Sequence, residues 1–266
     1  MDPLRLDFDD VLERLYLKFA VTQRDCELAG NYLRCFLHAK ISSPKMLIIL
    51  PQIADWAWHE LILDTRLYRE ICAGVFGGFL HHVIKDIHVG SHVRAEDMCE
   101  EDALTLRRNF KLSLAFMRQK YALTEISTEW TESGWDSPRY RFRNASYAEL
   151  LWNDLGEVDK AIPPRFSWLP ARIALRFGVT EMRARNAVAE YANAFGCGKL
   201  DKAYLLPPAV ELVWQEHILW TRRYAEDCNN AFGYFADHLP RDVLGTTLER
   251  ESGRFAREPN VALEGA

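Results

Sequence analysis

Five of the eight histidines lie within 34 residues, and this segment holds the densest group of side chains able to do chemistry. They are His59, His81, His82, His88 and His92. Imidazoles and thiolates bind zinc, and imidazoles also suit iron, so His81, His82, His88, His92 and Cys72 are candidate ligands. His88 and His92 have the spacing of two ligands on one helix face, although Gly90 between them disfavours a helix. One hypothesis is therefore a zinc or iron site built from this set.

A second candidate site starts at Asp55, which lies four residues before His59. On a helix, this carboxylate can orient the imidazole and favour its protonated form. Arg66 and Glu70 have the same spacing and continue the polar stripe on one helix face. A histidine held in this way can act as an acid–base group or bind an anion. We take His59 and Asp55 as candidate catalytic residues, and Arg66, Glu70 and Tyr68 as candidate binding residues, against the alternative of ordinary pairs on a solvated or inter-unit face.

Residues 51–82 recur at 207–238. At an offset of 156, fourteen of 32 positions are identical without gaps, and LKFAVT at 17–22 also matches LRFGVT at 175–180. Identity of this extent indicates an internal duplication. The polar stripe has counterparts that we take as further candidate binding residues: Glu211, Gln215, Arg222 and Glu226.

Two differences between the copies bear on chemistry. Gln215 replaces His59, so any proton chemistry at this position is expected in the first copy alone. Asp237 replaces His81, whereas His82 has a matching His238. For His82 and His238 the plainer expectation is a hydrogen bond to a backbone carbonyl at the end of the Phe-Gly turn.

The elements that would position these residues are all predicted to be helices. Residues 10–21 and 22–38 have helical periodicity, with Thr22 as an N-cap, and 97–121 form a further helix. Between Pro51 and Gly77 the pattern predicts one long helix, because proline favours a helix start and glycine a helix end. On this helix five residues share the face expected to pack in the core: Trp58, Ile62, Thr65, Cys72 and Phe76.

The predicted fold is therefore all-α, with two similar helical bundles from an internal duplication packed as a pseudo-symmetric pair. We expect a first unit at 1–126, an irregular connector at 127–167, a second unit at 168–251 and a loose tail at 252–266.

Composition limits the partners. The net charge of −5 offers no basic field for nucleic acid or anionic lipid. The most apolar stretch, 46–63, contains Asp55, His59 and Glu60, so a membrane span is not expected. The N-terminus has no signal-peptide pattern, and the six cysteines form no CxxC pair, which together predict a cytoplasmic protein with reduced thiols.

The string DWAWHELILDTRLYREIC followed by FGGFLHH resembles the glycine-rich-domain-containing-protein-like family. The matching positions are Asp55, Trp58, His59, Tyr68, Cys72, Gly77, His81 and His82. The second copy departs from this pattern at Gln215 and Asp237. The resemblance implies a helical fold and no particular reaction.

Two functional hypotheses follow, with a purely structural role for both stripes as a third. The first is a binding or scaffolding protein whose groove between the two units takes a protein or small-molecule partner. The alternative is a metal-binding protein or enzyme with a histidine-centred site in the first unit. The second hypothesis requires the histidines to converge in space.

Overall fold

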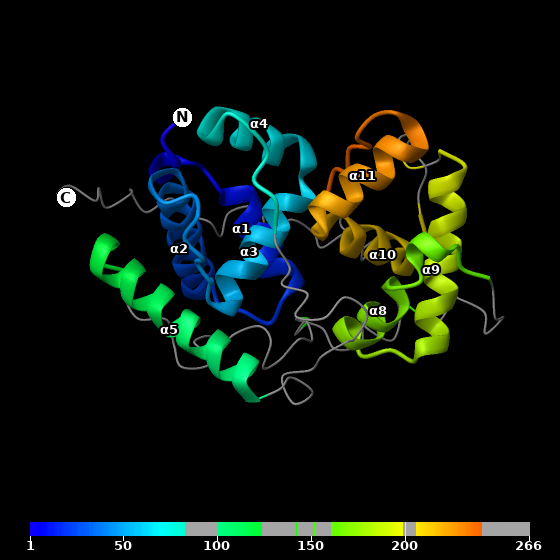
Figure 1. The fold of residues 1–266 in the computed structure, drawn as a ribbon, viewed down its shortest axis with the longest axis horizontal. Coiled ribbons are helices and arrows are strands. Elements are labelled where there is room, and N and C mark those ends of the chain that lie inside the picture. Colours follow the sequence, from blue (N-terminus) through cyan, green and yellow to red (C-terminus); the bar gives the residue numbers. More distant parts are fainter. Residues whose placement is uncertain are drawn as a thin grey trace.

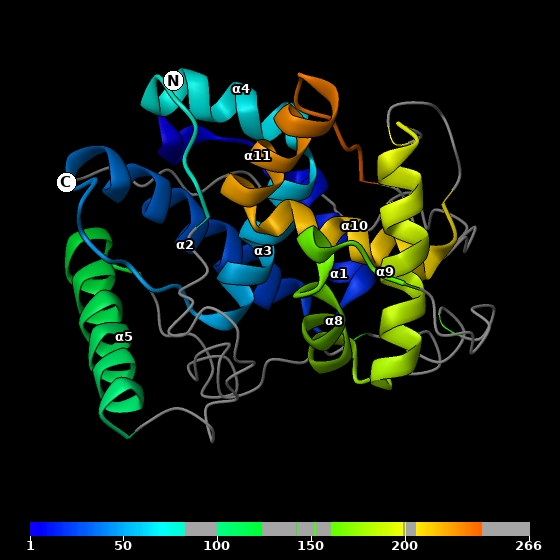
Figure 2. The same ribbon diagram turned by 45° about the vertical axis from the view of Figure 1, so that its right-hand side comes forward.

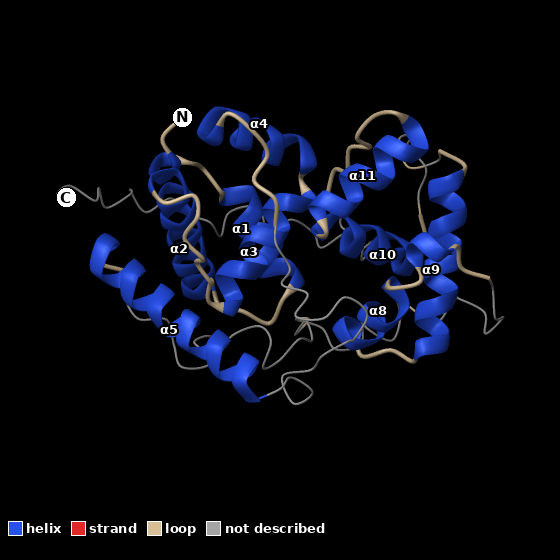
Figure 3. Cartoon of the chain, in the orientation of Figure 1, coloured by secondary structure: helices blue, strands red, loops and turns tan. Residues whose placement is uncertain are grey.

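The computed structural model describes residues 1–82, 100–123, 142, 152, 161–198, 200 and 206–240. Within these residues all regular structure is helical, as predicted, and there is no strand (Figure 3). Most of the predicted connector at 127–167 and the whole tail at 252–266 lie outside the described residues, as do His88 and His92. No described helix is both long and apolar enough to span a bilayer.

The helices of the first unit lie together at one end of the molecule (Figure 1). They are η1 (Pro3–Arg5), α1 (Asp9–Lys18), α2 (Gln23–Ser42), α3 (Gln52–Leu63), α4 (Thr65–Phe76) and α5 (Glu100–Tyr121). The side chain of Thr22 accepts a hydrogen bond from the amide of Asp25, whose carboxylate accepts from the amide of Thr22. This capping box starts α2 where the sequence predicted its N-cap.

The helices of the second unit lie at the other end (Figure 1). They are η3 (Pro164–Phe166), α8 (Leu169–Phe177), α9 (Glu181–Gly196), α10 (Pro208–Leu219) and α11 (Thr221–Phe232). Thr180 caps α9 by accepting from the amide of Arg183, at the position that matches Thr22.

Helices α3 and α10 form the centre of the molecule and contact each other (Figures 1 and 2). Helix α3 also packs on α1 and α2, and α10 packs on α8 and α9. Every residue of α3 is buried except Asp55, and every residue of α10 is buried except Pro208. Neighbours on all sides explain why both helices are buried on every face, including polar residues such as Glu60 and Glu216.

The prediction of one long helix from Pro51 to Gly77 was wrong, because the chain turns at Asp64 between α3 and α4. Asp64 has φ −82° and ψ 79°, and its side chain accepts from the amide of Leu67 at 3.2 Å, which caps α4. The second unit turns at the matching Trp220, with φ −84° and ψ 57°. Gly77 ends α4 in a left-handed conformation with φ 68°, as its residue type predicts.

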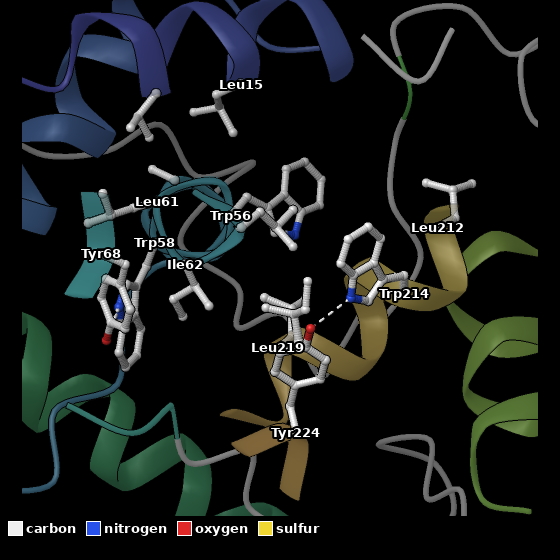
Figure 4. Packing of buried hydrophobic residues seen from close by; sticks show 14 of the residues in the cluster. Leu15, Trp56, Trp58, Leu61, Ile62, Tyr68, Leu212, Trp214, Leu219 and Tyr224 are labelled. Atoms are coloured by element: carbon white, nitrogen blue, oxygen red, sulfur yellow. Dashed lines mark hydrogen bonds between the residues drawn. The ribbon is translucent and has the colours of Figure 1, made fainter. Parts of the chain in front are cut away.

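Four of the five predicted core residues of this segment are buried and Phe76 is partly buried, although two helices share them. Trp58, Ile62, Thr65 and Cys72 are each less than a tenth exposed. The indole of Trp58 donates to the hydroxyl of Tyr68 at 3.3 Å, and that hydroxyl donates to the carbonyl of Leu80 at 2.6 Å. Figure 4 shows the indole–phenol pair in both units. In the second unit, Trp214 donates to Tyr224 at 3.0 Å, and Tyr224 to the carbonyl of Ala236 at 2.8 Å.

Candidate metal site

Asp55, His59 and His82 bring one carboxylate and two imidazoles to a common point. The Nε2 atom of His59 lies 3.2 Å from Oδ2 of Asp55 and 3.3 Å from Nε2 of His82. The Nε2 atom of His82 lies 3.8 Å from Oδ1 of Asp55. All three potential ligand atoms fall within 4.8 Å of one another, so these residues, here named the Asp–His–His cluster, could hold one metal ion.

Two helices and one turn position the cluster. Asp55 and His59 lie one turn apart on α3, which places both side chains on the same face. His82 follows the left-handed turn at Gly77, which sends the chain back past α3. The edge of the His82 ring meets both His59 and Trp58, with centroids 4.8 Å and 4.7 Å apart.

The second unit determines which nitrogen of His82 faces the cluster. Its Nδ1 atom lies 3.0 Å from the backbone carbonyl oxygen of Leu219. Because a carbonyl only accepts, Nδ1 must carry the hydrogen, and in the neutral ring Nε2 is left with a lone pair. That lone pair faces Asp55 and His59. This is the arrangement in which metal-binding histidines are held by a supporting carbonyl.

The spacing within the cluster suits an ion. With zinc–nitrogen bonds of about 2.0–2.1 Å, two ligand atoms of a tetrahedral site lie about 3.3 Å apart. The two contacts of His59, at 3.2 Å and 3.3 Å, are close to this separation. The distance from His82 to Asp55 is longer, at 3.8 Å, and is to the other carboxylate oxygen, Oδ1.

Burial sets the charges of the cluster. The side chain of His59 is 3% exposed and that of Asp55 is 33% exposed, so the cluster opens to solvent on the Asp55 side. Burial lowers the pKa of His59 to about 3, although Asp55 opposes this effect. Burial acts to raise the pKa of Asp55, but His59 and His82 outweigh it and lower that pKa to about 2. Asp55 favours the protonated form of His59, as expected, but burial outweighs this effect, so at neutral pH the cluster holds a carboxylate and a neutral His59.

The matching positions of the second unit form a different cluster, here named the Glu–Gln–His cluster. The Nε2 atom of His238 lies 2.5 Å from Oε1 of Glu211, which also accepts from the amide of Gln215 at 3.4 Å. The oxygen of Gln215 accepts in turn from Lys18 at 3.2 Å. This cluster has one imidazole and is closed by its own hydrogen bonds.

Other candidate residues lie outside both clusters. Because the chain turns at Asp64, the polar stripe is not continuous, and Arg66 and Glu70 lie exposed on α4. Their spacing would allow Arg66 and Glu70 to pair, but Nε of Arg66 lies 3.6 Å from Oδ2 of Asp237 instead. Tyr68 is fully buried and bonded in the core. The matching residues Arg222 and Glu226 lie exposed on α11.

The candidate metal ligands are likewise divided. Only His82 of the described candidates belongs to the Asp–His–His cluster. The sulfur of Cys72 accepts from the amide of Leu80 at 3.5 Å, and burial raises the pKa of its thiol. The ring of His81 contacts the hydroxyl of Thr221 at 3.2 Å.

The sequence did not predict that His82 lies beside His59, or that Thr221 and Leu219 of the second unit contact His82. A signal was present, since Thr65 and His82 are both identical in the two copies. Their matching partners, Thr221 and His238, make the corresponding contacts in the opposite unit. Identity at these positions reflects contacts between the units.

The described part of the chain is a helical protein with a candidate two-histidine, one-carboxylate metal site. Residues 8–116 and 185–258, more than half of the chain, match the UCP032817-like family, and the chain belongs to that family. The predicted membership of the glycine-rich-domain-containing-protein-like family was therefore wrong. The two matched regions contain one cluster each, which is compatible with a duplication. No curated protein and no solved structure matches the chain.

Proposed function

We propose that this protein binds one divalent transition metal ion, zinc or iron, through Asp55, His59 and His82. The observation that carries the proposal is the convergence of the two Nε2 atoms and the carboxylate at 3.2 to 3.8 Å. Imidazole nitrogen and carboxylate oxygen are ligands that zinc and iron both accept.

The orientation of His82 supports this proposal. Its Nδ1 donates to the carbonyl of Leu219, so in the neutral ring the Nε2 lone pair faces the cluster. A neutral imidazole whose other nitrogen bonds to a supporting carbonyl is the form that commonly binds a metal ion.

Three protein ligands also indicate the kind of site. A structural zinc ion commonly has four protein ligands, whereas a catalytic one keeps a position for water or substrate. Asp55 is the exposed member, so solvent reaches the cluster from its side. A bound ion would supply a Lewis acid and lower the pKa of a bound water. His59 and Asp55 would hold that ion, a role that replaces the acid–base function first considered for them.

The same evidence favours a duplicated, pseudo-symmetric pair of bundles as the framework of the site. The contacts of His82 with Thr221 and Leu219 have counterparts in those of His238 with Thr65 and Leu63. A groove-binding function has less support. Three of the candidate binding residues, Tyr68, Glu211 and Gln215, are buried.

The test uses neighbouring histidines as a matched pair. Untagged wild-type protein, His82→Ala and His81→Ala would be compared by elemental analysis after dialysis against zinc and then buffer. We expect close to one zinc per chain in wild type and in His81→Ala, and almost none in His82→Ala.

Because His82 also touches the second unit, Asp55→Asn serves as a second variant, with circular dichroism to check folding. It removes the ligand charge at the most exposed position and should lose the metal while remaining folded. Wild-type protein that retains no zinc, or folded Asp55→Asn that retains all of it, would contradict the proposal.

A further inference from the structure

His82 takes its position from the second unit. Its backbone amide donates to the hydroxyl of Thr221 at 3.0 Å, and its Nδ1 donates to the carbonyl of Leu219 at 3.0 Å. Thr221 begins α11 and Leu219 ends α10, so both contacts come from the junction of these two helices. One main-chain and one side-chain contact together fix both the place of the residue and the direction of its ring.

Within its own unit, the described polar contacts of the His82 ring are with His59 and Asp55. These two residues are the other members of the cluster and not supporting groups. If the second unit moved away, the ring would keep the edge contact with Trp58 but lose the acceptor that holds the hydrogen on Nδ1. The orientation needed for metal binding therefore depends on the contact between the units.

We propose that the metal site is completed across the two units, with Thr221 and the Leu219 carbonyl as positioning groups for His82. This inference rests on the proposed metal-binding function. Groups that support a metal ligand typically contribute 10–100-fold to metal affinity. Because linkage is reciprocal, a bound ion also strengthens the contact between the units by the same free energy. Metal occupancy and docking of the two units are thus coupled.

The chain contains a matched control at the corresponding place in the other unit. The hydroxyl of Thr65 accepts from the amide of His238 at 2.8 Å, and Nδ1 of His238 lies 2.6 Å from the carbonyl of Leu63. His238 belongs to the Glu–Gln–His cluster. Thr65→Ala therefore removes a comparable contact between the units without releasing a residue of the Asp–His–His cluster.

The experiment measures the zinc dissociation constant by competition with a chromophoric chelator. It uses the full chain as wild type, Thr221→Ala, Thr221→Ser and Thr65→Ala, with the melting temperature recorded for each. We expect Thr221→Ala to bind zinc about 10–100-fold more weakly, within the range for supporting groups. Thr221→Ser keeps the hydroxyl and should bind like wild type. Thr65→Ala should also bind like wild type, even where its melting temperature falls as far as that of Thr221→Ala.

Each other outcome has one meaning. Wild-type affinity in Thr221→Ala would overturn the inference and leave the metal site standing. Equal weakening in Thr65→Ala and Thr221→Ala would also overturn it, because general loosening would then explain the effect. Absence of zinc binding in wild type would overturn the proposed function and this inference with it.

Discussion

The Asp–His–His and Glu–Gln–His clusters occupy matching positions and differ in the contacts among their own side chains. In both, a histidine from one unit donates through Nδ1 to a backbone carbonyl of the other, at Leu219 or Leu63. The longer side chain of Glu211 reaches His238 at 2.5 Å, whereas the shorter Asp55 stops 3.8 Å from His82. The carboxylate and the imidazole are therefore in direct contact in the Glu–Gln–His cluster and lie farther apart in the Asp–His–His cluster.

The second difference is the residue between the acid and the histidine. His59 adds an imidazole nitrogen to the first cluster, while Gln215 adds an amide that bonds to Glu211 and to Lys18. The residues that the two clusters share make the contact between the units, and the proposed metal binding depends on the two positions at which the clusters differ. Exchanging the residues at these positions tests the proposed difference between the clusters.

The largest expected effect comes from making the first cluster resemble the second. His59→Gln removes an imidazole ligand and should weaken zinc binding by more than about 100-fold, beyond the range for supporting residues. Isothermal titration calorimetry with zinc measures the change. Gln215→Asn is the control and should leave the affinity unaltered. Full zinc binding by folded His59→Gln would show that the ion sits elsewhere.

The reverse exchange should create a site. Glu211→Asp with Gln215→His converts the second cluster into Asp–His–His, and the zinc stoichiometry should rise from one to two per chain. The new site should be the weaker of the two, because the ammonium of Lys18 reaches position 215. Native mass spectrometry counts the ions. A count that stays at one would mean that features beyond these two residues define the first site.

The shared framework should respond equally in both units. Tyr68→Phe and Tyr224→Phe each leave a buried indole and a backbone carbonyl without their hydroxyl partner. Each should lower the free energy of unfolding by about 1–3 kcal/mol, the typical cost of an unsatisfied buried group. Urea denaturation measures this free energy. A clear loss in one unit alone would break the correspondence between the frameworks.

The smallest expected effect is on the pH dependence of stability, and it comes from a histidine of the second unit. His217 stands where the first unit has Leu61, and its ring contacts the hydroxyl of Tyr191 at 2.8 Å. Burial lowers the pKa of His217, although Asp227 opposes this effect. Below about pH 6.5, His217 therefore binds a proton in the unfolded chain but stays neutral in the folded chain. This difference lowers the free energy of unfolding as the pH falls, by at most about 1.4 kcal/mol per pH unit.

Thermal unfolding between pH 7.5 and pH 5 checks this expectation. His217→Leu should be less stable at pH 7.5, because Tyr191 loses its partner, but should show a shallower loss of stability with acid. A pH dependence identical to that of wild type would exclude the histidine as its source.

The sequence predicted the helical class and the repeated segment because both depend on local pattern. It did not predict the turn at Asp64, where the amide and hydroxyl of Thr65 bond to His238 of the other unit. Trp220 turns in the same place without a side-chain cap, so no local signal marks this boundary in the second unit. Hydrogen bonds between distant segments determined the break.

The candidate site was predicted in part for the same reason. Asp55 and His59 are one helical turn apart, and this spacing is visible in the sequence. His82 joins them only because the turn at Gly77 and the contacts of Leu219 and Thr221 carry it there. The lowered pKa of His59 was not predicted, because the burial of this residue depends on neighbouring helices that the spacing alone does not reveal.

Anomalous X-ray diffraction at the zinc edge from crystals of the zinc-loaded full chain tests the central claim most directly. We expect one strong peak about 2.0–2.2 Å from Nε2 of His59, Nε2 of His82 and a carboxylate oxygen of Asp55. A peak bound instead to His81, His88, His92 or Cys72, or no peak in loaded crystals, would contradict it.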